Sequence, residues 1–359
     1  MNAPITRRHA VKTVAAAALG PFAGGLAAEI SARIRIGQIG TSHAHASGKM
    51  DAIRSLTDLY EVVGIAEPIA GRQAIAEKQE SFAGLQWMTE EALLADKSVR
   101  AVVVETTLGD SARAARACLH AGKHIHLDKP GAETHAEFKA LRLDAARLGL
   151  TVQMGYMLRY NPAFDLLFRA HREGWFGEIT GIDASMGKLA DARLHKQLAG
   201  IPGHGMFELG CHLVDAVVFL LGPPSAVNAF GKPTGLAPAG LPDNQLAVLE
   251  YPKATVTLRC NHGDPFGGPH RRFHVVGTKG AMEIQPLESG CGTLHLSEAR
   301  GAFKKGENKF VLEVPAGRYD GEFRDLASVL RDGKRLAWSA GHDIAVHDTA
   351  LRCAGISPA

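Results

Sequence analysis

A lysine held between a carboxylate and a proline is the first feature of this 359-residue sequence that suggests chemistry. Asp128-Lys129-Pro130 directly follows Lys123 to Leu127, a short apolar run with the pattern of a buried strand. Parallel sheets bind ligands beyond the carboxyl ends of their strands. A lysine at that edge can stabilise the negative charge that develops on a reacting oxygen. The placement therefore predicts a catalytic Lys129 with Asp128 beside it.

A second group of ionisable residues lies in Met206 to Leu221, whose apolar periodicity predicts one helix. Glu208 and His212 are four residues apart, and Asp215 follows three residues later, where it can orient the imidazole. His212 is suited to accept a hydroxyl proton, because the ordinary pKa of histidine lies near neutrality. Glu208 would hydrogen-bond substrate hydroxyls. With Lys129 as a cation for a developing alkoxide, the set contains the two groups, a base and a cation, that oxidation of a secondary alcohol needs.

A metal site is an alternative for the same segment. His204, Glu208 and His212 stand at four-residue intervals and could place three ligands on one helix face. A Gly/Pro-rich stretch further on holds four more possible ligands: His262, Asp264, His270 and His274. Glycines 203, 205 and 210 weaken the helix, so we predict no metal and keep the metal-dependent enzyme as an alternative.

The elements that must position Lys129 begin with a strand, a tight turn and a helix. An apolar run from Ile34 to Ile39 meets Gly40, and a helical segment follows at Met50. This order is typical of a dinucleotide-binding unit, in which the turn and the helix N-terminus bind a pyrophosphate. Taking Gly40 as the first glycine of G-x-G-x-x-G puts Ser42 at the second and His45 at the third. The expected cofactor loop consists of Gly40, Thr41, Ser42 and His43.

Later strand ends predict further cofactor contacts. A strand over 60–66 ends at Glu67, which suits a ribose hydroxyl, while Arg72 leaves a 2′-phosphate possible. Both NAD and NADP therefore stay open. Thr106 ends a β-branched run, and Asp128 and Lys129 end the next strand. Strands alternating with helices over residues 33–155 predict an α/β domain with a doubly wound parallel (Rossmann) sheet.

Residues 156–335 have a different pattern, in which short strands alternate with turns. Six runs predict an α+β domain with an open, mostly antiparallel sheet: 245–249, 255–260, 273–276, 281–284, 293–296 and 310–314. The stretch 191–201 is expected to be a polar, irregular loop over the site, and 319–332 and 342–353 to be helices. We expect the substrate cleft between the domains. Arg159, Tyr160 and His195, with Asp215, are candidates for contacting the substrate.

Residues 1–28 are expected to be an export signal and no part of the fold. The pair Arg7-Arg8, Lys12, an apolar stretch from Thr13 to Leu26 and small residues after it fit a twin-arginine signal. The stretch is too short and too weakly apolar to span a membrane. Export predicts a periplasmic or other external location. No free pool of NAD(P) exists there, so any nicotinamide must stay tightly bound.

Composition excludes some classes of protein. A hydrophobic content of 46% and a charged content of 21% are ordinary for a soluble globular protein. The net charge of +3 is not gathered in basic runs, which argues against a nucleic-acid partner. The five cysteines include no C-x-x-C pair, so they indicate neither a disulfide framework nor a zinc ribbon.

From about Arg33 to Ala354 the chain resembles the glucose-fructose oxidoreductase / inositol dehydrogenase / MocA (Gfo/Idh/MocA) family. Four segments in family order carry the resemblance. Ala121–Pro130 is similar to the family's AGKHVLCEKP segment, Met154–Ala163 to GF..RY.PA, Gly203–Asp215 to GGG...D.G.H..D, and Val276–Ile284 to GT.G.L.I. Asp128 replaces the usual glutamate, Glu208 the usual aspartate, and Ser42 the second glycine.

The resemblance implies a sugar or polyol substrate, a homodimer or homotetramer formed through the broad sheet, and a last helix (336–359) that packs near the first domain. It supports functional roles for Lys129 and His212. Two other activities fit the same fold. An NAD-recycling glycoside hydrolase or lyase would oxidise its substrate only transiently, and a redox-inactive periplasmic sugar-binding protein would have lost the reaction.

Overall fold

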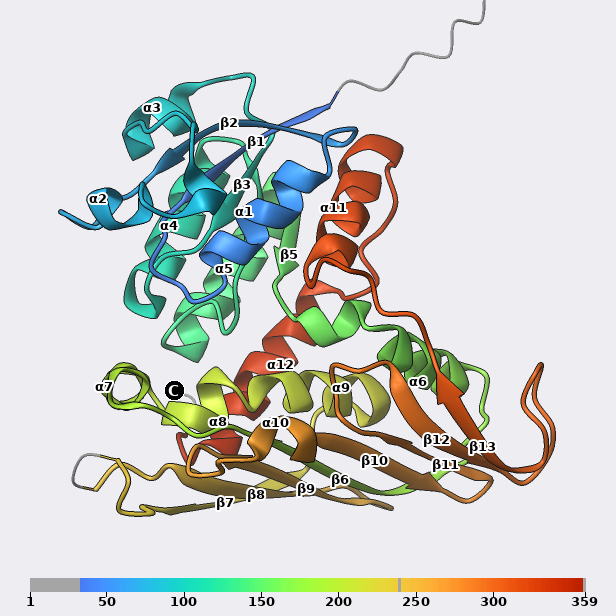
Figure 1. Cartoon of the computed structure of the whole chain (residues 1–359). Coiled ribbons are helices and arrows are strands. Elements are labelled where there is room, and N and C mark those ends of the chain that lie inside the picture. Colours follow the sequence, from blue (N-terminus) through green and yellow to red (C-terminus); the bar gives the residue numbers. More distant parts are fainter. Residues whose placement is uncertain (1–32, 238–239, 358–359) are drawn as a thin grey trace, which may run out of the picture. The chain divides into compact units, whose positions relative to one another are not determined.

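The computed structural model describes residues 33–237 and 240–357, and the predicted export signal lies outside the described residues. The chain from Arg33 onward forms one compact unit with two sheets. Figure 1 shows the two sheets with helices packed against them. A parallel sheet followed by a mostly antiparallel one confirms the predicted fold class.

The first sheet contains five parallel strands in the order β2-β1-β3-β4-β5. The strands are β1 (Ile34–Ile39), β2 (Tyr60–Ala66), β3 (Ala101–Val104), β4 (His124–Leu127) and β5 (Val152–Met154). β3 is apolar and buried at every position, as expected for the centre of a sheet covered on both faces. The strand order reverses between β1 and β3, and such a reversal opens a ligand crevice beyond the strand ends.

Helices connect these strands and cover the sheet. They are α1 (Ala46–Ser55), α2 (Gln73–Ala76), the 3-10 turn η1 (Glu80–Phe82), α3 (Glu90–Ala95), α4 (Leu108–His120) and α5 (His135–Leu148). The N-cap predicted at Thr134 is present, with Glu137 bonded to the Thr134 hydroxyl. The Thr134 side chain accepts from the Glu137 amide at 3.3 Å and bonds the Glu137 carboxylate at 2.8 Å. These bonds fix where α5 begins, directly after the Lys129 segment.

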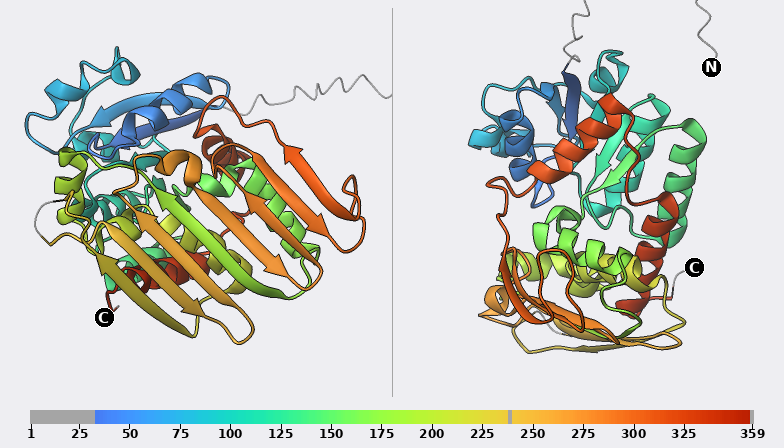
Figure 2. Two further views of the ribbon diagram at one scale, coloured as in Figure 1. Left: turned by 60° about the horizontal axis from the view of Figure 1, so that its bottom comes forward. Right: turned by 90° about the vertical axis from the view of Figure 1, so that its right-hand side faces the viewer.

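The second sheet contains eight strands in the order β13-β12-β11-β10-β6-β9-β8-β7. The strands are β6 (Ile179–Gly187), β7 (Ala226–Lys232), β8 (Asn244–Glu250), β9 (Thr255–Asn261), β10 (Arg272–Gly277), β11 (Gly280–Ile284), β12 (Cys291–Leu296) and β13 (Gly306–Val311). Only β6 and β9 pair in parallel, and the other neighbours are antiparallel. Figure 2 shows this broad sheet with helices on one of its faces.

Two of the expectations for the helices of the second half are wrong. The helices are η2 (Met157–Tyr160), α6 (Pro162–Arg172), α7 (Ala192–Ala199), α8 (His204–Glu208), α9 (Cys211–Leu221), α10 (Gly267–His270), α11 (Asp320–Asp332) and α12 (Ala340–Cys353). The expectation of an irregular loop over 191–201 is wrong, because α7 forms there. Asp191 caps it by accepting from the Leu194 amide at 2.7 Å.

The expectation of one helix from Met206 to Leu221 is also wrong. The amides of Leu209 and Gly210 both bond the Gly205 carbonyl, at 2.8 and 3.1 Å, which interrupts the regular helical pattern. Glycines at 205 and 210 weaken a helix at this point. Glu208 therefore ends α8, while His212 lies in α9.

The last two helices join the halves of the described chain. In α12, Asp343 pairs with Arg142 of α5 at 2.8 Å, and His347 stacks on Phe138. In α11, the Phe323 carbonyl accepts from the Tyr60 hydroxyl of β2. These buried contacts hold the first sheet against the second half. No helix among the described residues has the length and apolarity to cross a bilayer.

Candidate active site

The turn after β1 crosses the end of β3 in close contact. Gly40 has a φ of +86°, and a Cβ there would lie 2.8 Å from the Thr106 backbone, so only glycine fits. The amides of Ser42 and His43 both donate to the Glu105 carbonyl, at 3.1 and 3.0 Å. The turn is therefore fixed through its backbone, and its side chains are carried beyond the strand ends.

Glu67 and Arg72 brace this turn from the end of β2. One Glu67 oxygen accepts from the Thr41 amide at 2.7 Å and from the Thr41 hydroxyl at 2.5 Å. The Arg72 guanidinium donates to the Thr41 carbonyl at 2.6 Å. Both predicted cofactor contacts thus lie beside the loop, where a ribose of a dinucleotide is expected.

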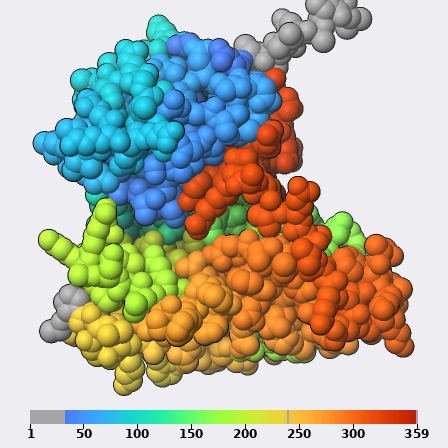
Figure 3. All heavy atoms as spheres, viewed as in Figure 1, coloured from blue at the N-terminus to red at the C-terminus, as the bar shows by residue number. Residues whose placement is uncertain are grey.

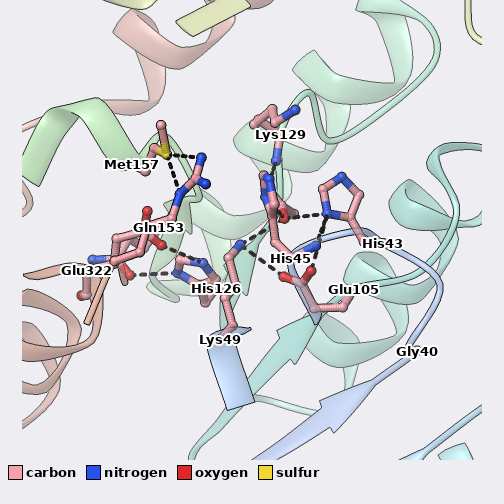
Figure 4. A network of polar contacts seen from close by, with 12 residues as sticks. Gly40, His43, His45, Lys49, Glu105, His126, Lys129, Gln153, Met157 and Glu322 are labelled. Carbon is pink, nitrogen blue, oxygen red and sulfur yellow. Dashed lines mark hydrogen bonds and ion pairs between the residues drawn. The ribbon is translucent and has the colours of Figure 1, made fainter. Parts of the chain in front are cut away.

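A buried ion network lies beneath the loop (Figure 4). Lys49 of α1 places its Nζ 2.9 Å from Glu105 and 3.0 Å from Asp128, and all three side chains are buried. Burial alone would lower the pKa of Lys49, but Asp128 and Glu105 raise it above its usual value. A side chain at Gly155 would meet the Lys49 ammonium at 2.6 Å. This glycine therefore leaves room for the charge.

Two histidines of the loop share the Asp128 carboxylate. His43 Nδ1 lies 2.7 Å and His45 Nδ1 2.9 Å from the same oxygen. Burial lowers the pKa of His43, but Asp128 and Glu105 outweigh it and raise that pKa to about 9. Burial keeps the pKa of His45 below its usual value despite Asp128. At neutral pH the loop therefore carries an imidazolium at His43 and a neutral ring at His45.

His43, His45 and Asp128 have the spacing of metal ligands, with ligand atoms within 4.8 Å of one another. However, Lys49 already places a positive charge on Asp128, and the protonated His43 has no lone pair to offer at Nδ1. The group fits a hydrogen-bonded ion network better than a metal site. Across residues 33–237 and 240–357 no other group has this spacing, so His204, Glu208 and His212 do not bring their ligand atoms together in this arrangement.

Lys129 and Glu208 form an ion pair at the wall of a cavity. Lys129 Nζ lies 2.8 Å from the Glu208 carboxylate and donates to the Glu208 carbonyl at 2.6 Å, and Lys129 is 2% exposed. Burial opposes charge on both groups. Glu208 nevertheless raises the pKa of Lys129, and Lys129 followed by Lys188 lowers the pKa of Glu208. Both partners are therefore charged at neutral pH, and the second Glu208 oxygen has no hydrogen-bond partner.

His212 is buried behind this pair. Its ring lies edge-on to Tyr156, and its Nδ1 has no hydrogen-bond partner among the described residues. Burial, with Lys129 adding to it, holds the pKa of His212 well below its usual value, so the ring is neutral. The expectation that Asp215 orients His212 is wrong. Asp215 instead pairs with Arg159 at 2.6 Å and His342 at 2.9 Å.

The residues expected to contact the substrate have other partners. Arg159 is buried between Asp215 and Asp343, each 2.6 Å from its guanidinium. The Tyr160 hydroxyl donates to Asp325 at 2.9 Å. His195 is buried, with its Nε2 3.8 Å from Asp243. Arg159, Tyr160, His195 and Asp215 do not line the cavity that contains Lys129, and neither does His212.

Two cavities lie along the loop. The larger, of about 460 Å³, extends from Ser42 and His43 to Lys129 and Glu208, and α7 closes it with Leu194 and Leu198. A neighbouring cavity of about 300 Å³ is lined by Arg72, Arg193 and the loop. In Figure 3 the yellow-green surface around α7 lies below the blue and cyan surface of the first half, with a hollow between them.

Several residues of this site were missed by sequence reasoning. Glu105 had a signal, because a carboxylate directly follows the apolar strand Val102-Val103-Val104. Lys49, Lys188 and Arg193 had none, since their importance depends on segments that only the fold brings together.

Comparison with known proteins identifies this arrangement. The model "Oxidoreductase family, NAD-binding Rossmann fold" matches residues 34–156, and "GFO/IDH/MocA C-terminal domain" matches residues 165–283. The chain belongs to the Gfo/Idh/MocA oxidoreductases. The predicted enzyme class, an NAD(P)-dependent oxidoreductase, is thereby confirmed. So is the nicotinamide cofactor.

Relatives within the Gfo/Idh/MocA family include polyol dehydrogenases. The NADP(+)-dependent scyllo-inositol 2-dehydrogenase of Bacillus subtilis is 25% identical over 279 residues, 71% of this chain and 76% of the relative. Inositol 2-dehydrogenase of Salmonella typhimurium is 22% identical over 311 residues, 84% and 85% of the two chains. Levoglucosan dehydrogenase in complex with NADH and levoglucosan has the same fold. The TM-score between the two structures is 0.75 at 20% sequence identity, and the match covers 90% of this chain and 98% of the levoglucosan dehydrogenase chain.

The residues present fit a nicotinamide dinucleotide. Gly40 lets the turn pass close over β3. The smaller cavity beside the turn is lined by cationic side chains, and the larger one by the Lys129–Glu208 pair. The pyrophosphate would lie against His43 and Arg72, and the nicotinamide toward Lys129. In this modified turn, charged side chains would meet the pyrophosphate where the family pattern has a glycine backbone.

Proposed function

We propose that the protein is an exported oxidoreductase that transfers a hydride between a tightly bound NAD(P) and a hydroxyl of a sugar or polyol. Family membership supports the reaction class. The polyol and sugar substrates named for its relatives support the substrate class. The twin-arginine pattern at Arg7-Arg8 supports export. The observation that carries the proposal is the Lys129–Glu208 ion pair in the wall of a cavity that begins at the nucleotide loop.

Within this site a bound nicotinamide would supply the hydride acceptor or donor. Lys129 stays protonated, so it donates a hydrogen bond to the substrate oxygen and stabilises the alkoxide. The free oxygen of Glu208 accepts from a neighbouring substrate hydroxyl. His212 is the proposed proton acceptor, because its ring is neutral and its Nδ1 has no partner among the described residues, whereas Lys129 is protonated and Glu208 is paired with it.

The charges around the loop support the proposed retention of the cofactor. The imidazolium of His43 and the guanidinium groups of Arg72 and Arg193 face the space beside Ser42 and α1. A pyrophosphate there would form charge-assisted hydrogen bonds, which are about twice as strong as neutral ones. α7 also covers this space through Arg193 and Gln197. An enzyme outside the cytoplasm needs such retention, because it cannot exchange its nucleotide with a free pool.

We also propose that the protein assembles as a homodimer or homotetramer through the broad sheet. Large apolar side chains on its strands are exposed, including Phe230 of β7, Val276 of β10 and Val311 of β13. An interface over this sheet would remove these side chains from water. Light scattering on purified protein at several concentrations tests the assembly. A monomer at every concentration would contradict it.

Nucleotide content tests the proposed function. The exported protein is purified without added cofactor and denatured, and its supernatant is assayed for nicotinamide nucleotide. We expect close to one nicotinamide nucleotide for each protein chain. A nucleotide-free protein whose melting temperature does not rise with NAD or NADP would contradict the proposal.

A further inference from the structure

Lys188 is a charged residue in the wall of the larger cavity, and it has no role in the reaction proposed above. It follows β6 directly, and its amide donates to the Asn261 carbonyl of β9 at 3.0 Å. The preceding residue, Gly187, accepts from the Arg271 guanidinium at 3.0 Å. Its backbone is therefore fixed on both sides, and its half-buried side chain lines the same cavity as Lys129 and Glu208.

The ammonium of Lys188 is not paired. No hydrogen bond or ion pair within residues 33–237 and 240–357 joins it to an acidic side chain. Glu208, the nearby acid whose pKa it lowers, is already bonded to Lys129, and Arg271 is paired with Glu288. Burial lowers the pKa of Lys188; Glu208 opposes this shift and Lys129 adds to it. A second positive charge thus stands near the Lys129–Glu208 pair without an ion-pair partner of its own among the described residues.

Such a charge is costly unless a ligand compensates it, because a partly buried cation loses water contacts without gaining a partner. The surroundings strengthen an electrostatic contact. Leu194, Leu198 and Ile201 line the same cavity with apolar side chains, so less water would screen a bound anion there. Glu133 also lines the cavity, from the segment that follows Pro130. It forms no ion pair with Lys188 among the described residues.

We propose that Lys188 binds an anionic group of the substrate, so that the preferred substrate is a sugar acid, such as a uronic or aldonic acid, and not a neutral sugar. The carboxylate would lie on Lys188 while a hydroxyl on the same molecule reaches Lys129 and Glu208. This inference rests on the proposed function, since it names the substrate class of that site. It makes Lys188 a specificity-determining residue.

Matched pairs of compounds test the inference. Wild-type protein with bound nicotinamide is tested with three pairs, each of an acid and its neutral counterpart. The pairs are D-glucuronate with D-glucose, D-galacturonate with D-galactose, and D-gluconate with D-glucitol. The rate of nicotinamide reduction and the shift in melting temperature are measured for each. We expect the acid member of at least one pair to have a kcat/KM roughly tenfold or more above its neutral partner, the size of one charge-assisted hydrogen bond.

Three variants separate the charge from other effects. Lys188→Met should remove the preference for the acid, mainly through KM, and Lys188→Arg should restore much of it. Lys196→Met, an exposed lysine on α7 that lines neither cavity, should leave the preference as in the wild type. Nucleotide content is measured for every variant, so loss of cofactor is distinguished from loss of the substrate contact.

The inference is overturned if the neutral members are preferred, or if no pair differs in rate or in melting temperature. It is also overturned if Lys188→Met keeps the wild-type preference. A wild-type protein that binds no NAD(P) would instead contradict the proposed function. The two failures are therefore distinguishable.

Discussion

Lys129 donates to both the carboxylate and the main-chain carbonyl of Glu208, at 2.8 and 2.6 Å, although the two residues belong to different halves of the described chain. Lys129 follows β4, and Glu208 ends α8. The contact therefore fixes the first half of the chain against the second at the cavity. It also positions one ammonium group where a substrate oxygen can reach it.

Replacement of Lys129 should abolish most of the turnover. Lys129→Met removes the cation that stabilises the alkoxide, and loss of one such donor typically costs about 10²–10³-fold in kcat. We expect bound nucleotide to remain, because its pyrophosphate lies at the other end of the site. Steady-state rates and nucleotide content check this. Lys139→Met, an exposed lysine on α5, is the matched control. Full turnover by Lys129→Met would remove the catalytic assignment.

Cofactor affinity should fall at high pH. The pKa of His43 is raised to about 9, so the imidazolium is present below that pH and is lost above it. Binding to an anion favours the charged form, and affinity for NAD(P) should therefore decrease as the pH rises through about 9. Titration of nucleotide-free protein by calorimetry on both sides of this pH measures the change. His43→Gln should bind more weakly at neutral pH and lose the dependence. An equal dependence in His43→Gln would refute the role of His43.

Gly40→Ala should damage the nucleotide loop beyond the usual cost of a positive φ. The added Cβ would lie 2.8 Å from the Thr106 backbone, which cannot move aside without shifting β3. Gly71→Ala is the matched control, because Gly71 has a φ of +75° and an open surrounding. We expect a loss of roughly 1–3 kcal/mol in the free energy of unfolding for the control and a larger one for Gly40→Ala. Urea unfolding of both variants decides. Equal losses would show that the close approach to Thr106 does not matter.

Arg159 should act through stability and not through substrate binding. Arg159→Met leaves Asp215 and Asp343 as buried carboxylates without this partner, and breaking such a buried pair costs about 3–5 kcal/mol. The exposed Arg147 pairs with Asp144 within one helix, and Arg147→Met should cost at most about 1 kcal/mol. Denaturant unfolding measures both losses. If Arg159→Met kept wild-type stability but raised KM, the original assignment to the substrate pocket would be correct after all.

The sequence predicted the fold class because periodicity reports which faces are buried. The apolar run Val102-Val103-Val104 became a fully buried central strand, and Thr134 with Glu137 formed the predicted cap of α5. Such features depend on neighbours within one element, which a sequence displays directly.

The parts of the site that sequence reasoning missed depend on long-range contacts. His45 meets Asp128 across 83 residues, and Asp215 meets His342 across 127. The expected partnership of His212 with Asp215 assumed a regular helix. The amides of Leu209 and Gly210 both donate to the Gly205 carbonyl, and this broke the regularity. Spacing alone cannot show which of several possible partners a buried charge will have.

The central claim is that a retained nicotinamide performs the redox chemistry. The most direct measurement is the absorbance of protein purified without added nucleotide while a sugar or polyol is added, followed by a carbonyl compound. We predict reduction of bound nicotinamide in an amount equal to the loaded protein, reversed by the carbonyl compound. An absorbance change that appears only when free NAD(P) is supplied would contradict retention, and no change under either condition would contradict the redox function itself.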